Sequence, residues 1–297
     1  MRKVVLIGLG AVGLTYAVKL KDKCDLNILV DKTRLEKYKK NKPIFNGVEQ
    51  DFNYVLPEEG FDTDLIIIST KSQGLESAIK CIKNFVSSKT RIVSLINGIS
   101  SENKIKQIYP QAKVLKSYFI GHSAVRSGNS VTQDGVGEIV IEKDDFIEEF
   151  FSETGVNYSA PSDIDYSMWL KFTFNSYANP LSAILDMNFG ELKQNAYFRD
   201  FSKNIIYEIK QIAEKKGIKN LENLEADALN SLDRMCDDGK TSTHQDILAK
   251  RPTEIDIFSG EVIRMGKELG IKTPYNQFLY DLIKIKEENN EHSIHTC

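Results

Sequence analysis

Three closely spaced glycines, directly after an apolar run near the N-terminus, constrain this chain more than any other feature. Residues 4–7 are rich in β-branched side chains and predict a buried parallel strand. Gly8, Gly10 and Gly13 follow in a G-x-G-x-x-G pattern that leads into a helical segment. In such a turn the first glycine permits the tight bend, the second lets a pyrophosphate approach the backbone, and the third lets the helix pack on the strand. The strand–turn–helix context therefore predicts a dinucleotide-binding fold.

An acidic residue at the end of the next apolar run supports this prediction. Asp31 follows residues 26–30, close to the roughly 20-residue spacing at which a carboxylate meets the adenosine ribose in NAD-binding folds. The alternative is an ordinary glycine turn with a solvated aspartate beyond a core strand. The backbone expected to contact the cofactor is that of Gly8, Leu9, Gly10, Ala11, Val12 and Gly13.

Composition excludes several classes of protein. The 297 residues are 41% hydrophobic and 27% charged, as in globular domains, and the formal net charge of −3 gives no reason to expect a nucleic-acid partner. No run approaches the roughly 20 apolar residues of a membrane span, and the glycines and charges after the first run argue against a secretory signal. The cysteines include no C-x-x-C pair, which favours reduced thiols in a cytoplasmic protein over disulfides or a metal site: Cys24, Cys81, Cys236 and Cys297.

The order of apolar runs predicts the architecture. In the first half, short β-like runs alternate with helical segments, which predicts an α/β Rossmann-type domain over residues 1–163. Residues 164–297 show helical spacing and predict an all-α domain. The glycine-rich residues 121–141 are expected to form a hairpin or edge strands that close the sheet. The expected strands are 4–7, 26–30, 65–69, 92–96 and 114–119, and the expected later helices are 166–185, 198–216, 221–235, 253–269 and 276–289.

Polar residues follow two of the expected strands. Lys71 follows residues 65–69, and Asn97 with Gly98 follows residues 92–96. Because ligands of parallel sheets bind beyond the carboxyl ends of the strands, we expect these residues near the dinucleotide. A solvated loop lysine and an ordinary Asn-Gly turn are the alternatives.

A polar stripe marks the first long helix of the second half. Lys171, Asn175 and Asn179 are spaced i, i+4, i+8 and share one face, among aromatic neighbours. Such a partly buried stripe needs partners, and it suits a lysine that donates a proton while amides hold it. A solvated helix face is the alternative.

Two later segments also carry polar side chains. Residues 241–246 (TSTHQD) are interpreted as a hydroxyl-rich loop, in which His244 is a candidate catalytic base. In the segment RPTEID, Thr253 is a candidate cap for the helix expected at 253–269. Glu254, in the first turn of that helix, could simply interact favourably with the helix dipole.

Together these motifs resemble the ketopantoate reductase (2-dehydropantoate 2-reductase) family over nearly the whole chain. The K-x3-N-x3-N-P-L helix combined with T-E-I-D is more specific than the glycine turn. The resemblance implies a Rossmann-type domain followed by a 6-phosphogluconate dehydrogenase C-terminal-like helical domain. The matching segments are GLGAVG, Thr70-Lys71, Ile96-Asn97-Gly98, the glycine-rich residues 121–137, the helix from Lys171, Gly190-Glu191-Leu192, Ser242 with Gln245-Asp246, and Thr253-Glu254-Ile255-Asp256.

The resemblance also implies an activity and its residues. The expected reaction is the NAD(P)H-dependent reduction of 2-dehydropantoate, a small 2-oxo acid, to pantoate in the cytoplasm, and a homodimer is compatible with the sequence. A charged donor would stabilise the developing alkoxide. The implied roles are Lys171 as general acid, Asn175 and Asn179 as its support and substrate contacts, Ser242 on the substrate carboxylate, Glu254 on the distal hydroxyl and near the cofactor, Asn97 between cofactor and substrate, and Lys71 on the cofactor.

Three positions depart from the family pattern. Asp31 stands where the NADPH-dependent family often has a basic residue, which favours NADH, although Lys32 and Arg34 beside it could still bind a 2′-phosphate. Gly74 replaces a common glutamine, and Phe189 replaces a common asparagine in the substrate region. A related dehydrogenase for another small 2-oxo or hydroxy acid is therefore the alternative, and a non-catalytic dinucleotide sensor is a third.

Overall fold

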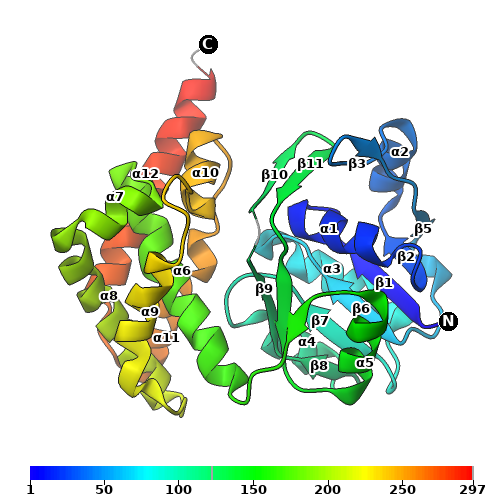
Figure 1. Ribbon diagram of the computed structural model, residues 1–297, viewed down its shortest axis with the longest axis horizontal. Coiled ribbons are helices and arrows are strands. Elements are labelled where there is room, and N and C mark those ends of the chain that lie inside the picture. Colours follow the sequence, from blue (N-terminus) through cyan, green and yellow to red (C-terminus); the bar gives the residue numbers. More distant parts are fainter. Residues whose placement is uncertain (122, 296–297) are drawn as a thin grey trace. The chain divides into compact units, whose positions relative to one another are not determined.

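The structure, a computed structural model, describes residues 1–121 and 123–295. The chain divides into two compact units, Met1–Ile164 and Asp165–Cys297. The first unit is built on a parallel sheet with helices, and the second is helical (Figure 1). This confirms the predicted fold class.

The first unit is organised around a six-stranded sheet in the order β5-β2-β1-β6-β7-β8, and all its neighbouring strands are parallel. β1 lies at the centre, so that Val5 and Leu6 are fully buried. Strands buried on both faces read as continuous apolar runs, which is why they could be recognised in the sequence. The strands are β1 (Lys3–Ile7), β2 (Asp25–Leu29), β5 (Asn53–Val55), β6 (Leu65–Ile68), β7 (Arg91–Ser94) and β8 (Lys113–Leu115).

Alternate side chains of the strands form two cores, one on each face of the sheet. Val4 and Leu6 belong to the core that includes residues of α1 and α5, whereas Val5 and Ile7 belong to the core that includes residues of α3 and α4. Each helix therefore buries one apolar stripe against the sheet. The helices of this unit are α1 (Ala11–Leu20), α2 (Lys32–Lys40), α3 (Leu75–Cys81), α4 (Ser101–Ile108) and α5 (Asp145–Thr154), with short 3-10 turns η1 (Pro57–Glu59), η2 (Ser72–Gly74) and η3 (Lys83–Phe85).

The glycine-rich region forms a hairpin, as expected, but it does not close the main sheet. β10 and β11 pair with each other and, through β3, join a separate four-stranded sheet; β9, β12 and β13 form a third sheet. The single strand expected at 114–119 is two strands, β8 in the main sheet and β9 in the third. These strands are β3 (Ile44–Phe45), β4 (Val48–Glu49), β9 (Ser117–Ile120), β10 (Ser123–Ser127), β11 (Ser130–Asp134), β12 (Glu138–Ile141) and β13 (Tyr158–Ser159).

The second unit contains the expected helices with shifted ends and two helices that were not expected. Residues 241–246, interpreted as a loop, begin helix α10, because the Thr241 hydroxyl caps its first turn by accepting from the His244 N–H at 3.2 Å. The other addition is α7. The helices are α6 (Ile164–Leu185), α7 (Phe189–Gln194), α8 (Ala196–Lys215), α9 (Leu224–Asp233), α10 (Ser242–Leu248), α11 (Ser259–Leu269) and α12 (Pro274–His295), with 3-10 turns η4 (Leu221–Asn223) and η5 (Ile255–Ile257).

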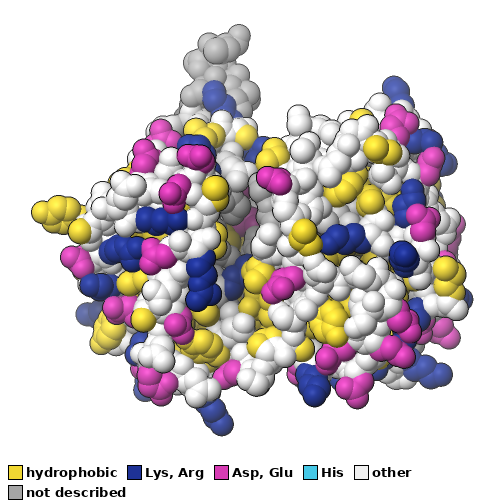
Figure 2. All heavy atoms as spheres, in the orientation of Figure 1, with side chains coloured by type: hydrophobic (Ala, Val, Ile, Leu, Met, Phe, Trp, Pro, Cys, Tyr) yellow, Lys and Arg dark blue, Asp and Glu magenta, His cyan; other side chains and the backbone are white. Residues whose placement is uncertain are grey.

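The surface and the cysteine thiols show little that narrows the class of protein further. Within the described residues, no helix is both long and apolar enough to cross a membrane. On the face shown in Figure 2, basic and acidic side chains are interspersed. Cys24, Cys81 and Cys236 are free thiols, and Cys297 lies outside the residues that the structure describes.

A buried carboxylate joins the amino ends of two sheet strands to helix α5. Asp144, which is 4% exposed, caps α5 by accepting from the Ile147 N–H at 3.0 Å. Its oxygens also accept from Arg91 at 2.9 Å and from Lys113 at 2.7 Å. Burial alone would raise the pKa of Asp144, but the hydrogen bonds from Lys113, the Ile147 N–H and Arg91 outweigh it and hold the pKa below 3.8.

We expect Asp144→Ala to lower the free energy of unfolding by about 3 kcal/mol, because it removes a cap and leaves two cations without their partner. Since the folded-state pKa is depressed, this contribution is present at neutral pH and is lost as the pH falls through that pKa. Urea unfolding at pH 7 and at pH 3 measures both effects. The control is Lys39→Ala, which breaks an exposed pair with Glu36 and should cost well under 1 kcal/mol; equal losses in the two variants would contradict the account.

Candidate active site

The glycine turn after β1 is packed so closely that two of its residues must be glycine. Gly8 has a φ of +102°, and a Cβ there would lie 2.6 Å from the Ser69 carbonyl oxygen. A Cβ on Gly13 would lie 1.8 Å from the Gly8 carbonyl oxygen. At Gly10, by contrast, a Cβ would lie at an ordinary contact distance of 3.8 Å from the Ser69 carbonyl oxygen. Packing within the protein therefore explains Gly8 and Gly13 but leaves Gly10 to be explained by an approaching ligand.

The helix after this turn begins without a side-chain cap. Gly10 is the N-cap of α1, and because it has no side chain it makes no side-chain cap bond to the first turn. The N–H groups of Ala11, Val12 and Gly13 precede the first i→i−4 bond, from Leu14 to Gly10 at 3.0 Å. Free N–H groups at the start of a helix, with the helix dipole behind them, suit a pyrophosphate. Leu9 is 5% exposed and anchors the turn in the core. The residues present therefore fit a dinucleotide.

Two further predicted residues follow strands at the same edge of the sheet. β1, β6 and β7 end level with one another, since the Ser69 N–H donates to the Ile7 oxygen at 2.9 Å and the Leu95 N–H to the Ile68 oxygen at 2.8 Å. Lys71 comes just after β6 and is exposed, and Asn97, in the loop after β7, is half-buried. This edge is where parallel sheets bind their ligands.

Asp31 has a local structural role that the sequence reading missed. It caps α2: its Oδ1 accepts from the Arg34 N–H at 2.7 Å, and the Arg34 Nε lies 3.7 Å from its Oδ2. Lys32 pairs with Glu58 at 3.4 Å. A carboxylate has about four lone-pair sites, so capping leaves Asp31 able to accept from ribose hydroxyls.

In the helical unit, the polar stripe of α6 runs from partly buried to buried positions. Lys171 and Asn175 are half-buried, and Asn179 is 4% exposed. The Asn179 amide lies 3.4 Å from the Ser242 hydroxyl, and Ser182 contacts Thr241 at 2.5 Å. The start of α10 is thereby held against α6. Two predicted site residues far apart in the sequence, Asn179 and Ser242, thus lie together.

The T-E-I-D segment is more buried than its sequence suggested. Thr253 and Glu254 are 1% and 9% exposed. Thr253 accepts from the Ile255 N–H at 3.3 Å and so supports the short turn η5, whereas α11 begins only at Ser259. The expectation that Thr253 caps the long helix is therefore wrong. Glu254 is a buried carboxyl at the start of η5 rather than a solvated residue in the first turn of a long helix.

His244 does not have the exposure of a catalytic base. Its side chain is 1% exposed, and its Nε2 lies 2.7 Å from Oδ1 of Asp186, just after α6. The hydrogen bond with His244 and its charge lower the pKa of Asp186. The pair fastens α10 to the end of α6, a structural role that the sequence did not reveal.

Phe189 takes part in an aromatic contact with α6. It is 9% exposed, and its ring centroid lies 6.5 Å from that of Phe174, one helical turn after Lys171. The ring also lies against Gly239, where a Cβ would come within 2.9 Å of it. Phe189 therefore contacts both α6 and the segment that leads into α10. The neighbouring Asn188 caps α7 by accepting from the Glu191 N–H at 2.9 Å.

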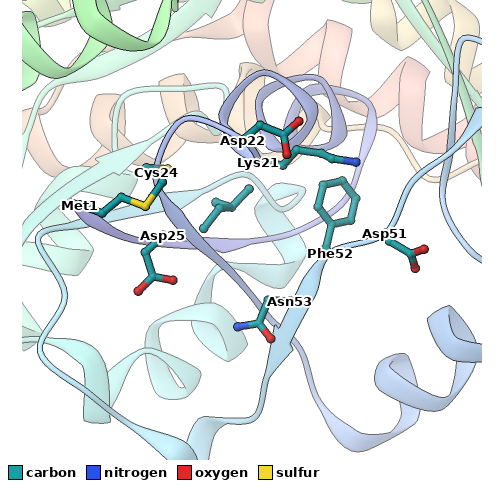
Figure 3. A pocket seen from close by; sticks show the side chains of 9 residues that line it. Met1, Lys21, Asp22, Cys24, Asp25, Asp51, Phe52 and Asn53 are labelled. Carbon is teal, nitrogen blue, oxygen red and sulfur yellow. The ribbon is translucent and has the colours of Figure 1, made fainter.

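A separate hollow of about 490 Å³ lies at the amino end of β2, where the chain enters the sheet. It is at the opposite end of the strands from the glycine turn and is not the candidate site. Among residues 1–121 and 123–295, no group of three or more His, Cys, Asp or Glu is placed to hold a metal ion. The side chains labelled around the hollow in Figure 3 are Met1, Lys21, Asp22, Cys24, Asp25, Asp51, Phe52 and Asn53.

Comparison with known proteins identifies the family. The model described as "Ketopantoate reductase PanE/ApbA" matches residues 4–145, and that of its C-terminal domain matches residues 163–287. A 2-dehydropantoate 2-reductase of Lactococcus lactis is 30% identical over 249 residues, 76% of each chain. The chain belongs to the ketopantoate reductase family. It is an NAD(P)-dependent oxidoreductase of the 2-dehydropantoate 2-reductase type.

Two further proteins are similar to this chain over most of its length. A 2-dehydropantoate 2-reductase of Aquifex aeolicus is 29% identical over 244 residues, covering 77% of this chain and 78% of that protein. Among solved structures, D-mandelate dehydrogenase with NADH and anilino(oxo)acetate is 27% identical, with a TM-score of 0.85, over 97% of this chain and 99% of that one. These relatives support a nicotinamide dinucleotide as the cofactor and a small oxo acid as the kind of substrate that the family uses.

For the glycine turn, effects on stability and effects on NADH binding can be measured separately. Gly10→Ala should fold with nearly wild-type thermal stability, because its Cβ meets only an ordinary contact, but it should weaken NADH binding at least tenfold by blocking the approach of the pyrophosphate. Gly13→Ala should instead lower stability, since its Cβ would overlap the Gly8 carbonyl. Thermal unfolding and fluorescence titration with NADH measure the two effects; a Gly10→Ala variant that binds NADH normally would contradict the proposed cofactor contact.

Proposed function

We propose that this protein reduces the ketone of a small 2-oxo acid to a 2-hydroxy acid, with 2-dehydropantoate as the first candidate substrate. In this proposal residues 1–163 bind the dinucleotide, and residues 164–297 bind the substrate and supply the catalytic lysine. The observation that carries the proposal is the stripe of Lys171, Asn175 and Asn179 with Ser242 held beside it, in a chain of the ketopantoate reductase family.

The residues of the first unit that are proposed to hold the cofactor lie at the carboxyl edge of the sheet. The backbone from Gly8 to Gly13 would bind the pyrophosphate, and Asp31 would accept from the ribose hydroxyls. Lys71, Asn97 and Glu254 are the further proposed contacts. When bound, the reduced dinucleotide supplies a hydride for the carbonyl carbon. We infer a preference for NADH, because the Asp31 carboxylate repels a 2′-phosphate and Arg34 already interacts with that carboxylate.

Lys171 is the proposed proton donor. Its ammonium hydrogen-bonds the ketone oxygen, polarises the carbonyl and donates a proton as the alkoxide develops. Asn175 and Asn179 orient the ammonium and the substrate, so that the reacting groups meet with little further loss of entropy. The Ser242 hydroxyl donates to the substrate carboxylate, and Glu254 accepts from a distal hydroxyl. The balance is one hydride to carbon and one proton to oxygen, which gives the 2-hydroxy acid.

A second candidate substrate is a 2-oxo acid with an apolar or aromatic side chain. Phe189 occupies a position where the family commonly has asparagine, and its ring packs with that of Phe174 on α6, so that its surface is apolar. Such surface offers no partner for a substrate hydroxyl. D-mandelate dehydrogenase, the neighbour with bound anilino(oxo)acetate, has an aromatic substrate by name. A non-catalytic sensor is disfavoured, because it has no need of a lysine held among amides.

Lys171→Ala should reduce kcat by at least about 10²-fold, because it removes the general acid. Lys203→Ala is the matched control: Lys203 lies on α8, is half-exposed and pairs with Asp200, and its removal should leave kcat unchanged. Steady-state oxidation of NADH, followed at 340 nm, measures both. A near-normal kcat for Lys171→Ala would remove the proposed acid.

Substrate choice should depend on residue 189. We expect Phe189→Asn to shift the ratio of kcat/KM for ketopantoate to that for phenylglyoxylate at least tenfold towards ketopantoate, since an amide can pair with the substrate hydroxyl and a phenyl ring cannot. The assay compares ketopantoate, phenylglyoxylate and 2-oxoisocaproate with both NADH and NADPH. An unchanged ratio would show that Phe189 does not contact the substrate, and no reduction of any of the three acids would contradict the proposed function.

A further inference from the structure

The loop that carries Asn97 has a buried hydrogen-bond chain across its base. This loop, residues 95–100, runs from β7 to α4. The Ser94 hydroxyl, at the end of β7, donates to the Ser101 hydroxyl at 3.0 Å, and the Ser101 hydroxyl donates to Oε2 of Glu102 at 2.9 Å. The three side chains belong to residues that are 0%, 3% and 7% exposed. The two ends of the loop are therefore joined through side chains in the protein interior.

A third element joins the same chain. The Ser117 hydroxyl of β9 donates to the Ser94 carbonyl at 3.0 Å and accepts from the Ser94 N–H at 3.2 Å. The backbone of Ser117 also hydrogen-bonds the Glu102 carboxyl. Glu102, in the first turn of α4, therefore bonds both to Ser101 of the same turn and to Ser117 of β9. It is the acidic end of a network that spans β7, α4 and β9.

The second oxygen of Glu102 is buried and has no hydrogen-bond partner. An ionised carboxylate in this position would keep charge in the interior without full compensation, whereas a neutral carboxyl costs much less. Burial raises the pKa of Glu102 to about 7. Hydrogen bonds from the Glu102 backbone, the Ser101 hydroxyl and the Ser117 backbone, together with the charge of Lys116, oppose this shift. Lys116 follows β8 and is the charged side chain that acts on this group. Glu102 therefore changes charge near neutral pH.

A simpler interpretation is that Glu102 only stabilises the fold. Glutamate in the first turn of a helix is favoured by the dipole, and a buried acid can be a packing element. Two observations are not explained by a purely stabilising role. The hydrogen bonds of Glu102 run to the residues that flank the Asn97 loop, and one of its oxygens has no partner that would make the ionised form stable.

We propose that Glu102 is a positioning residue for the reaction: its neutral carboxyl, through Ser101, Ser94 and Ser117, fixes the loop that presents Asn97 between cofactor and substrate. This inference rests on the proposed function, in which Asn97 lies beside the reacting groups. Ionisation of Glu102 puts a charge that is not fully compensated into the interior. The segment then opens to solvate the carboxylate, which loosens residues 95–100 and lowers the rate. The neutral form predominates below the pKa, so activity from this source is present at pH 6 and falls as the pH rises through neutrality.

The test compares Glu102→Gln and Glu102→Ala with the wild type. Glutamine reproduces the neutral carboxyl, so Glu102→Gln should keep kcat within about threefold at pH 6 and lose the decline in kcat that the wild type shows near pH 7. Glu102→Ala should lower kcat at least tenfold and speed amide hydrogen exchange over residues 95–100. The measurements are kcat and KM from pH 6 to pH 8.5 and hydrogen exchange followed by mass spectrometry.

Glu208→Gln is the matched control. Glu208 on α8 is also a buried acid, 4% exposed, whose pKa is raised by burial, but it caps α12 by accepting from the Asn276 N–H at 3.0 Å. Its substitution should lower thermal stability and leave both the pH profile of kcat and exchange in the loop unchanged.

Three results would overturn the inference. The first is a Glu102→Gln variant that keeps the wild-type decline near pH 7. The second is a folded Glu102→Ala variant with normal kcat and normal exchange over residues 95–100. The third is a Glu208→Gln variant that changes the pH profile as Glu102→Gln does. If the wild type reduces no 2-oxo acid, the proposed function fails, while hydrogen exchange still decides whether Glu102 holds the loop.

Discussion

The first unit depends on the close approach of the turn after β1 to the end of β6. Gly8 can lie against the Ser69 carbonyl, and Gly13 against the Gly8 carbonyl, only because neither carries a Cβ. This contact sets where α1 begins and leaves its first N–H groups without a side-chain cap. It also brings the loops after β1 and β6 together at one edge of the sheet. The edge at which we propose that the dinucleotide binds is thus a consequence of backbone packing, and Gly10 leaves room there for a ligand.

In the helical unit, α6 has an aromatic face that packs in the core and a polar face that carries the proposed site residues. Its aromatic residues form the core, and Phe172 and Tyr177 are almost fully buried. Its polar stripe ends at Asn179, which meets the start of α10 through Ser242. The pair of His244 and Asp186 fastens α10 to the end of the same helix. The position of the proposed carboxylate-binding hydroxyl is therefore set by contacts with the helix that carries the proposed acid.

The sequence predicted elements whose apolar pattern is continuous, and it failed where single side chains decide the backbone. The buried strands β1, β2, β6 and β7 are recognisable in the sequence as continuous apolar runs, and the long helices from the periodicity of their apolar residues. The hydroxyl-rich residues at the start of α10 predict a loop, whereas the Thr241 cap makes them the first turn of a helix. The capping role of Asp31 and the buried contacts of Glu102 were invisible for the same reason: they depend on which atoms meet in three dimensions. The residues proposed for catalysis came from spacing and family resemblance together.

The central claim is that the ammonium of Lys171 protonates a ketone whose carbon receives hydride from the bound dinucleotide. The most direct measurement is a crystal structure of the protein with NAD⁺ and a 2-hydroxy acid product. The account predicts that Lys171 Nζ lies about 2.6–3.2 Å from the product hydroxyl oxygen, with the nicotinamide C4 facing the carbon that bears it. A structure in which another side chain occupies that position, or in which Lys171 is directed into solvent, would contradict it.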